Sequence, residues 1–453
     1  MRADARGGGL PRAIPSAGGP AATMRARTLL ALALLAGAVV LAPAPRAEDA
    51  PPMYAFINGR WFDGRTFVDR IFFTSYGELD AHSPGRVDST VDLQGAYVIP
   101  PFGEAHNHNA GMTGPDAAAI TARYLREGIY YVKNPGNLPT GRAARSAVNV
   151  AGSIDVVYAN GVLTAPGGHP LGLVRRNIAR GLMTQADGEG AFYFTVETRA
   201  DVDRKWPAIL AGRPDFIKTL LLFSEEYERR RADSTAFAWK GLDPKLLPYI
   251  VSKAHAEGLR VSTHVETAAD FRAAVAAGVD EINHLPGFRP ERDALAGYDR
   301  LARYVLTDAD ARQAAAHQVV VVTTVSGVLE ILAADTSAAD RARVRAVRTM
   351  IVGNLRTLHR RGVPIALGSD RFRSTSSAEA FALHRLGVFD DLTLLKMWCE
   401  TTAATIIPWR KLGKLADGYE ASFLVLDGDP LADFEHVRGI TLRVKQGRIL
   451  PEP

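Results

Sequence analysis

The sequence has a single cysteine, Cys399, among its 453 residues. An intramolecular disulfide is therefore excluded, and no cysteine near the N-terminus is available to carry a lipid anchor. No excess of positive charge remains once residues 1–47 are set aside, because this segment holds six arginines and one acidic residue, which matches the formal net charge of +5. The remainder is neutral overall and has no basic stripe, so nucleic acid is not an expected partner.

The chain also lacks an apolar run that is long enough to cross a membrane. The uncharged segment 29–42 is shorter than the ~20 residues that a membrane-spanning helix needs. It follows the basic stretch Met24-Arg25-Ala26-Arg27 and precedes the small-residue stretch 42–47, which is the order of a secretory signal. Residues 1–47 are therefore predicted to be a disordered leader and signal peptide, and the mature protein to be periplasmic or secreted, with no stable membrane span. An uncleaved membrane anchor is the alternative.

Two strand-rich segments lie towards the two ends of the chain. In residues 48–98, short β-type runs are separated by turns, and Asn58-Gly59 and Asp63-Gly64 are typical of hairpins. Residues 406–453 repeat this pattern of short strands and turns. We expect the two segments to form one small β-sandwich.

Strand-like and helix-like stretches alternate between these segments, over residues 99–405, which predicts parallel βα units. The expected strands are residues 102–108, 129–133, 154–163, 216–222, 260–264, 280–284, 319–324 and 364–369. Helical periodicity is clearest in residues 116–127, 244–257, 267–277, 308–317 and 340–361. Eight such strands in a segment close to the ~250 residues of a typical barrel predict an α/β fold with a (β/α)8 TIM barrel.

Metal-binding side chains follow separate predicted strands, in the order His106, His108, Lys218, His264, His284 and Asp370. In a (β/α)8 barrel, catalytic residues come from the C-terminal ends of several strands, so these side chains are expected to lie together. Alternate residues of a strand point to the same side, which lets His106 and His108 bind one metal with Asp370. His264 and His284 suit a second metal. An ammonium cannot ligate a cation, but a carbamate formed from Lys218 and carbon dioxide has two oxygens that can bridge two metals.

Three motifs carry a family resemblance: Pro100-Pro101-Phe102-Gly103-Glu104-Ala105-His106-Asn107-His108, Phe216-Ile217-Lys218 and Gly368-Ser369-Asp370. They resemble the amidohydrolase superfamily, and within it the imidazolonepropionase-like and prolidase-like group. The family usually has Pro-Gly and then Asp-x-His-x-His in the first motif. Pro101 and Glu104 are therefore departures, and neither removes a ligand.

The resemblance implies a binuclear metal-dependent hydrolase of carbon–nitrogen bonds. His106, His108 and Asp370 would hold one divalent metal, His264 and His284 the other, with carboxylated Lys218 between them. A hydroxide that bridges the metals would attack the amide, and Asp370 would take up its proton and pass it to the leaving amine. Zinc is the first expectation, although manganese, cobalt and iron suit the same ligands.

Two residues are candidates for contact with the substrate. His169 follows Gly167-Gly168 after the third strand, and the related group carries a similar Gly-Gly-His. Tyr227, nine residues after Lys218, could donate a hydrogen bond to a developing oxyanion, with a solvated loop tyrosine as the alternative.

By the resemblance, the substrate is a small molecule such as a dipeptide or an N-acyl amino acid. Two alternatives stay open: a lactone, ester or cyclic-amide hydrolase that uses the same site, and a non-catalytic protein that binds a metal or a ligand. The oligomeric state is also open, with a homo-oligomer among the options.

Overall fold

The leader expected from the sequence cannot be compared with the fold. The computed structural model describes residues 51–111, 115–288, 298–333 and 338–452, so the leader at residues 1–47 lies outside the described residues. Within the described ranges, no helix combines the length and the apolar character that a membrane crossing requires.

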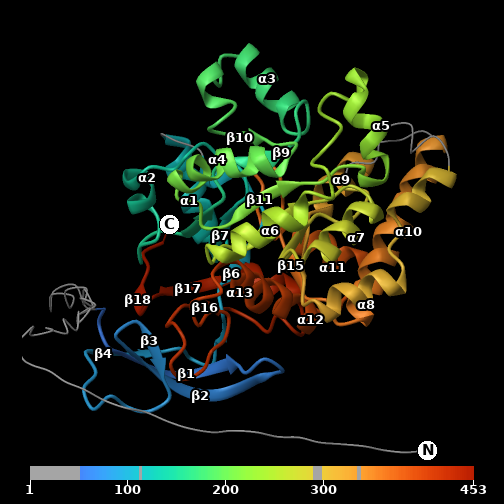
Figure 1. Ribbon diagram of the computed structural model, residues 1–453. Coiled ribbons are helices and arrows are strands. Elements are labelled where there is room, and N and C mark those ends of the chain that lie inside the picture. Colours follow the sequence, from blue (N-terminus) through green and yellow to red (C-terminus); the bar gives the residue numbers. More distant parts are fainter. Residues whose placement is uncertain (1–50, 112–114, 289–297, 334–337, 453) are drawn as a thin grey trace, which may run out of the picture. The chain divides into compact units, whose positions relative to one another are not determined.

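Parallel strands that alternate with helices build the centre of the fold (Figure 1). The strands are β6 (Phe102–Glu104), β7 (Ile129–Asn134), β8 (Asp155–Tyr158), β9 (Val162–Thr164), β10 (Tyr193–Thr195), β11 (Ile217–Leu220), β12 (Val261–His264), β13 (Glu281–Asn283), β14 (Val320–Thr323) and β15 (Ile365–Leu367). The helices are α1 (Pro115–Arg126), α2 (Arg142–Ala147), α3 (Leu171–Ala179), α4 (Arg199–Ala211), α5 (Tyr227–Ala232), α6 (Leu247–Ala256), α7 (Ala268–Ala277), α8 (Asp308–Ala316), α9 (Val325–Ala333), α10 (Ala338–Arg360), α11 (Ser376–Leu386), α12 (Asp391–Lys396) and α13 (Thr402–Ile406). Each strand expected for the barrel is present, and the third is divided into β8 and β9.

The parallel strands form two sheets that are joined by further contacts of the chain. One sheet has the order β6-β7-β8 and the other the order β10-β9-β11-β12-β13-β14-β15. The first connection is the chain itself, which runs from β8 into β9. The second joins β6 to β15, because Ala105, just after β6, donates a backbone hydrogen bond to the carbonyl of Leu367 in β15 at 2.8 Å. The fold is therefore TIM-barrel-like, although the strand ladder of the described residues is not continuous around a closed barrel.

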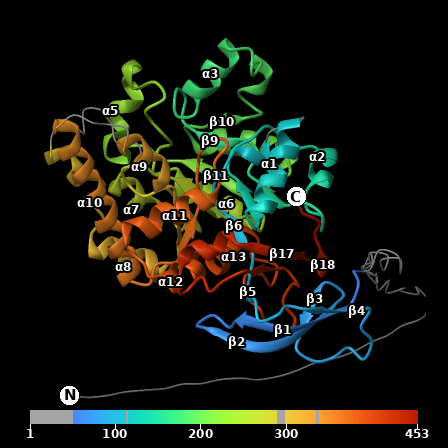
Figure 2. The ribbon, with the colours of Figure 1, turned by 180° about the vertical axis from the view of Figure 1, so that it is seen from behind.

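The two terminal segments share one sheet of eight strands. It contains β1 (Tyr54–Phe62), β2 (Phe67–Ser75), β3 (Glu78–Asp80), β4 (Ser89–Asp92), β5 (Tyr97–Ile99), β16 (Phe423–Leu426), β17 (Ile440–Lys445) and β18 (Arg448–Ile449). The segments meet where β5 pairs antiparallel with β16, with Val98 opposite Val425. Within residues 51–452, Figures 1 and 2 show β1 and β2 on the side opposite to α3 and α5. A sandwich of two facing sheets stays a prediction.

The two hairpin signals have different outcomes. Asp63-Gly64 lies in the turn between β1 and β2, where Phe62 pairs with Phe67. Asn58-Gly59 is not a turn, because both residues lie inside β1, where the register shifts between Phe56 and Gly59 and Asn58 has a φ of 56°. The hairpin predicted there is wrong, since Asn-Gly suits a bulge that needs a positive φ as well as it suits a turn.

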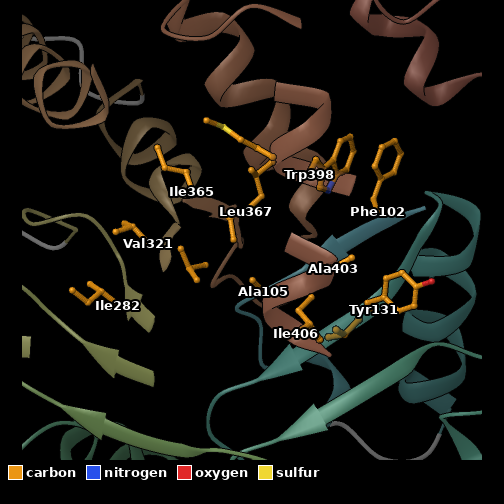
Figure 3. Packing of buried hydrophobic residues seen from close by; sticks show 14 of the residues in the cluster. Phe102, Ala105, Tyr131, Ile282, Val321, Ile365, Leu367, Trp398, Ala403 and Ile406 are labelled. Atoms are coloured by element: carbon orange, nitrogen blue, oxygen red, sulfur yellow. The ribbon is translucent and has the colours of Figure 1, made fainter. Parts of the chain in front are cut away.

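A helical segment near the C-terminus packs against β6 and β15 (Figure 3). It consists of the π-helix Met397–Thr401 and α13. The rings of Phe102 and Trp398 stack with their centroids 3.7 Å apart, and the Thr402 hydroxyl accepts a hydrogen bond from the backbone N–H of Leu367 at 3.0 Å. A Cβ on Gly103 would lie 2.7 Å from the Thr402 side chain, so this close approach requires glycine. These contacts fix the two strands that lead to His106 and Asp370.

Candidate metal centre

The six candidate ligands come from five different strands of the parallel sheets. His106 and His108 follow β6, Lys218 lies within β11, and His264 is the last residue of β12. His284 directly follows β13, and Asp370 comes three residues after β15. Lys218 and three of the histidines are buried, namely His106, His264 and His284. The candidate ligands thus lie within or just after strands of the parallel sheets.

A carboxylate lies at the centre of the first group of ligands. The Oδ1 atom of Asp370 is 3.5 Å from Nε2 of His106 and 3.3 Å from Nε2 of His108. One potential ligand atom from each of His106, His284 and Asp370 lies within 4.8 Å of the other two. Three strands therefore deliver donor atoms to one point.

The hydrogen bond of His108 identifies which of its ring nitrogens can act as a ligand. Nδ1 lies 2.9 Å from the carbonyl oxygen of Gly136. A carbonyl only accepts hydrogen bonds, so Nδ1 carries the hydrogen and a neutral ring has its lone pair on Nε2. This lone pair and the Asp370 carboxylate are both acceptors, and a cation between them would satisfy both.

His284 connects the first group of ligands to His264. Its ring centroid lies 4.7 Å from that of His106 and 4.5 Å from that of His264. The Nδ1 atom of His284 is 2.7 Å from the Thr324 hydroxyl, which fixes the orientation of the ring. His264 was expected to share a metal with His284, and the two rings are indeed neighbours.

The protonation states of these groups suit a cation. Burial lowers the pKa of His106 to about 4, although Asp370 acts in the opposite direction. Burial also lowers the pKa of His284 well below its usual value, and the neighbouring histidines add to this effect. Burial would raise the pKa of Asp370, but His106, His108 and His284 outweigh it and hold that pKa well below its usual value. At neutral pH these side chains thus offer lone pairs and one negative charge, as metal binding requires.

A buried atom without a hydrogen-bond partner also favours a bound cation at this site. Nδ1 of His106 is buried and has no hydrogen-bond partner. A buried polar atom of this kind costs free energy unless a partner compensates for it. Together with the donor set of imidazoles and a carboxylate, it shows that the residues present fit a divalent cation.

Lys218 belongs to the same centre, but its amine has a different direct partner. The amine donates a hydrogen bond to Oδ1 of Asn283. Burial lowers the pKa of Lys218 to about 7, while Glu281 and Asp370 act to raise it. A sizeable fraction of this amine is therefore neutral near pH 7.

The backbone is strained at two of the candidate ligands. His284 has a φ of 76° and Asp370 a φ of 45°. This left-handed region costs non-glycine residues of order 1–3 kcal/mol and persists only where the surroundings hold it. Here the backbone N–H of His284 donates to Val322 at 3.0 Å and that of Asp370 to His106 at 2.9 Å. Strain at both positions is typical of a functional site.

The two candidates for substrate contact have different surroundings. The ring of His169 lies over that of His264, with centroids 5.5 Å apart and an angle of 26° between the planes. Tyr227 is the first residue of α5 and is largely buried. Burial raises the pKa of its hydroxyl, and the charged groups with the largest effects on it, led by Asp243 and Arg231, are not candidate ligands. The structure thus brings His169, but not Tyr227, into contact with the histidine cluster.

Three residues of the site were not assigned from the sequence. Glu266 places Oε1 3.1 Å from Nε2 of His264, and the alternation His264-x-Glu266 could have indicated it. Phe288 stacks on His284 with centroids 3.9 Å apart, and no motif marks it. Glu104 accepts hydrogen bonds from the backbone N–H and the hydroxyl of Ser369, at 2.8 and 2.9 Å. It therefore anchors the loop that carries Asp370.

Comparisons with known proteins agree with this architecture. Residues 240–450 match the model of the amidohydrolase family. The chain is similar to a prolidase crystallised with N-methylphosphonate-L-proline, at 20% identity and a TM-score of 0.67, with 88% of this chain and 100% of that chain covered. It is also similar to A. niger ochratoxinase, at 18% identity and a TM-score of 0.65, with 88% and 96% covered. A Xaa-Pro dipeptidase with bound methionine is similar at 16% identity and a TM-score of 0.62, with 88% and 99% covered.

The solved structures share the fold of this chain at low identity, and no curated protein matches the sequence. The family match spans His264, His284 and Asp370 and so includes half of the candidate ligands. The resemblance seen in the motifs and the expectation of an enzyme that hydrolyses carbon–nitrogen bonds are confirmed at the level of the family. Residues 240–450 therefore match the amidohydrolase family, in agreement with the resemblance seen in the motifs.

Proposed function

We propose that this protein hydrolyses the amide or peptide bond of a small substrate, with a dipeptide or an N-acyl amino acid as the first expectation. The observation that carries the proposal is the convergence of His106, His284 and Asp370 to within 4.8 Å of one another, at the ends of three strands. The folds shared with a prolidase and a Xaa-Pro dipeptidase support the choice of substrate.

The centre would hold two divalent cations, with zinc as the first choice. His106, His108 and Asp370 would hold one, His264 and His284 the other, and a carbamate on Lys218 would bridge them. Such cations, when bound, lower the pKa of water towards neutral and polarise the bond to be cleaved.

The chain's own residues would supply proton transfer and positioning. Asp370 would accept a proton from the attacking water and donate it to the leaving amine. His169, which lies over His264, would donate a hydrogen bond to the substrate. Tyr227 is retained as a proposed second donor, and Tyr227→Phe tests it.

Aromatic side chains flank the centre and favour a substrate with an apolar group. Phe288 stacks on His284, and Phe372 lies 6.3 Å from the ring of His108 with 66% of its surface exposed. Two apolar rings beside polar ligands match a substrate whose amide is adjacent to a hydrophobic side chain.

The test is an assay of dipeptides, N-acyl amino acids, esters and lactones, with the metal content of the protein measured in parallel. We expect turnover of an amide that a chelator abolishes and added zinc restores. Turnover of esters or lactones without amides would favour the alternative hydrolase. A metal-loaded protein that turns over none of these classes would contradict the proposal and favour a binding protein. Asp370→Asn serves as the catalytic control.

Export and domain division are further parts of the proposal. Residues 1–47 would be a leader with a signal peptide, residues 99–405 the hydrolase barrel, and residues 48–98 and 406–453 two parts of one sandwich. Mass spectrometry of the mature N-terminus, after expression of the full chain in a bacterium, would locate the cleavage. An intact N-terminus would contradict a cleaved signal.

A further inference from the structure

Lys218 of the candidate metal centre is part of a buried polar network. The network crosses three neighbouring strands, because Lys218 of β11 is in register with Ser262 of β12, which is in register with Glu281 of β13. The Lys218 amine donates to Oδ1 of Asn283, and Nδ2 of Asn283 donates to Oε1 of Glu281 at 2.9 Å. The Ser262 hydroxyl lies 2.8 Å from Oδ1 of Asn283 and 2.9 Å from Oε1 of Glu281. All of these side chains are buried.

The network leaves the Asn283 amide one orientation. Oε2 of Glu281 accepts hydrogen bonds from the Lys133 ammonium and from the Thr405 hydroxyl, both at 2.8 Å. Paired in this way, Glu281 is a carboxylate and can only accept hydrogen bonds. The atom of Asn283 that faces it must therefore be the NH₂ nitrogen, and the amide oxygen must face Lys218. A flipped amide would set oxygen against oxygen and nitrogen against nitrogen.

Carboxylation would leave Lys218 with a single donor. In the reaction, the lone pair of the neutral amine forms a bond to the carbon of carbon dioxide, a C=O electron pair moves onto oxygen, and one N–H proton leaves to solvent. The nitrogen keeps one hydrogen. Because a carbamate is planar like a peptide group, the direction of that N–H fixes the plane in which the two oxygens lie.

We propose that Asn283 is the positioning residue for the carbamate of Lys218: its amide oxygen accepts the single remaining N–H and so orients the two carbamate oxygens. The inference rests on the proposed function, since it requires that Lys218 is carboxylated. Ser262 and Glu281 act through Asn283, because they hold its amide in the required orientation. Asn283 touches no substrate in this role.

The experiment measures carbamate formation rather than turnover alone. Full-length parent and Asn283→Leu are stripped of metal and carbon dioxide, then reloaded with zinc over a series of ¹³C-bicarbonate concentrations. Carbon NMR reports the carbamate, and metal analysis and activity are measured on the same samples. We expect Asn283→Leu to need about tenfold more bicarbonate for half-saturation, the effect of losing one hydrogen bond to a buried group. Its activity should rise in parallel as bicarbonate is added.

A matched control comes from the same two strands. The hydroxyls of Thr219 in β11 and Thr263 in β12 share a buried hydrogen bond of 2.8 Å. Thr219 follows Lys218 directly and therefore points to the opposite side of the sheet. Thr219→Val breaks a buried polar pair of similar cost and is expected to keep the parent's dependence on bicarbonate. A shift in Thr219→Val as large as that in Asn283→Leu would mean general damage to the strands and would overturn the assignment.

The possible failures are distinguishable. If the parent shows a carbamate and Asn283→Leu forms it at the same bicarbonate concentration, the role of Asn283 is wrong while the proposed function stands. If the parent shows no carbamate at any concentration, the bridging role of Lys218 fails together with this inference. If Asn283→Leu does not fold, Ser262→Ala takes its place, because it removes only the hydroxyl beside the amide oxygen of Asn283. A bicarbonate dependence in Ser262→Ala equal to that of the parent would equally contradict the positioning role of Asn283.

Discussion

Removal of the Lys133 ammonium should destabilise the protein, because it leaves a buried carboxylate without its cation. Lys133 and Glu281 are 2% and 1% exposed, and their charged atoms lie 2.8 Å apart. Loss of one partner of such a buried pair costs about 3–5 kcal/mol. Glu281 keeps hydrogen bonds from Thr405 and Asn283, so we expect Lys133→Met to fall at the lower end of this range, about 3 kcal/mol.

The dependence of this loss on pH has a definite sign. Burial would raise the pKa of Glu281, but Lys133, with hydrogen bonds from Thr405 and Asn283, outweighs it and lowers the pKa to about 2. The unfolded value is about 4.3, so the carboxylate of the parent contributes stability above that pH and loses the contribution as the pH falls towards 2. In Lys133→Met burial dominates, the folded pKa lies above the unfolded value, and protonation stabilises the variant. The difference between parent and variant should therefore narrow on acidification.

Urea unfolding of the metal-free proteins at pH 7, 5 and 4 measures this difference. The double variant Lys133→Met with Glu281→Gln is the control, because it removes the uncompensated charge and should recover most of the loss. The reasoning is refuted if Lys133→Met costs less than about 1 kcal/mol at pH 7, well under the range for a broken buried pair. It is refuted as well if the difference stays constant with pH.

The remaining predictions concern the centre itself. Asp370→Asn should keep most of the bound metal and lower kcat by about 10²–10⁴-fold, because an amide cannot accept the proton; metal analysis beside steady-state kinetics checks this, and an equally active variant would remove Asp370 from proton transfer. Lys218→Ala should lose activity that a short carboxylic acid in solution partly restores, and full activity without the acid would exclude an essential carbamate. His169→Ala should raise KM more than it lowers kcat in saturation curves, whereas an effect on kcat alone would contradict a binding role. In the metal-free protein the pKa of His106, about 4, lies below the unfolded value of about 6.5. The free energy of unfolding, measured with urea, should therefore fall as the pH drops from about 6.5 to about 4. A free energy of unfolding that does not change over this interval would contradict a neutral buried ring.

The barrel strands could be predicted because of their burial. A parallel strand that is covered on both faces reads as a short, largely apolar run, as β9 and β15 do, and both are buried at every position. A ligand then stands at or near the point where the run ends, as His264 does. The spacing His106-x-His108 predicted that both rings share one side, and both face Asp370 in the structure.

Contacts that depend on long-range register could not be predicted in the same way. The sequence places Lys218 and Glu281 in different strands, but only the pairing through Ser262 brings them to one level of the barrel. Phe288 likewise follows a strand by several residues, and its stack on His284 depends on the path of the connection. Asn58-Gly59 shows that even a strong local signal fits two structures, since a bulge and a turn both use a positive φ.

The arrangement of the two buried lysines is the clearest case in which the partner decides the chemistry. A carboxylate such as Glu281 inside a barrel core needs a cation, and both Lys133 and Lys218 are buried. In the structure Lys133 lies 2.8 Å from the carboxylate, and the direct acceptor of Lys218 is the neutral amide of Asn283. Burial lowers the pKa of Lys133, but the bound carboxylate of Glu281 acts against this and favours the ammonium, whereas an amine that faces an amide oxygen can lose its proton and attack carbon dioxide. Lysine is therefore structural at position 133, where it is paired with Glu281, and we propose that it is reactive at position 218, where it is not.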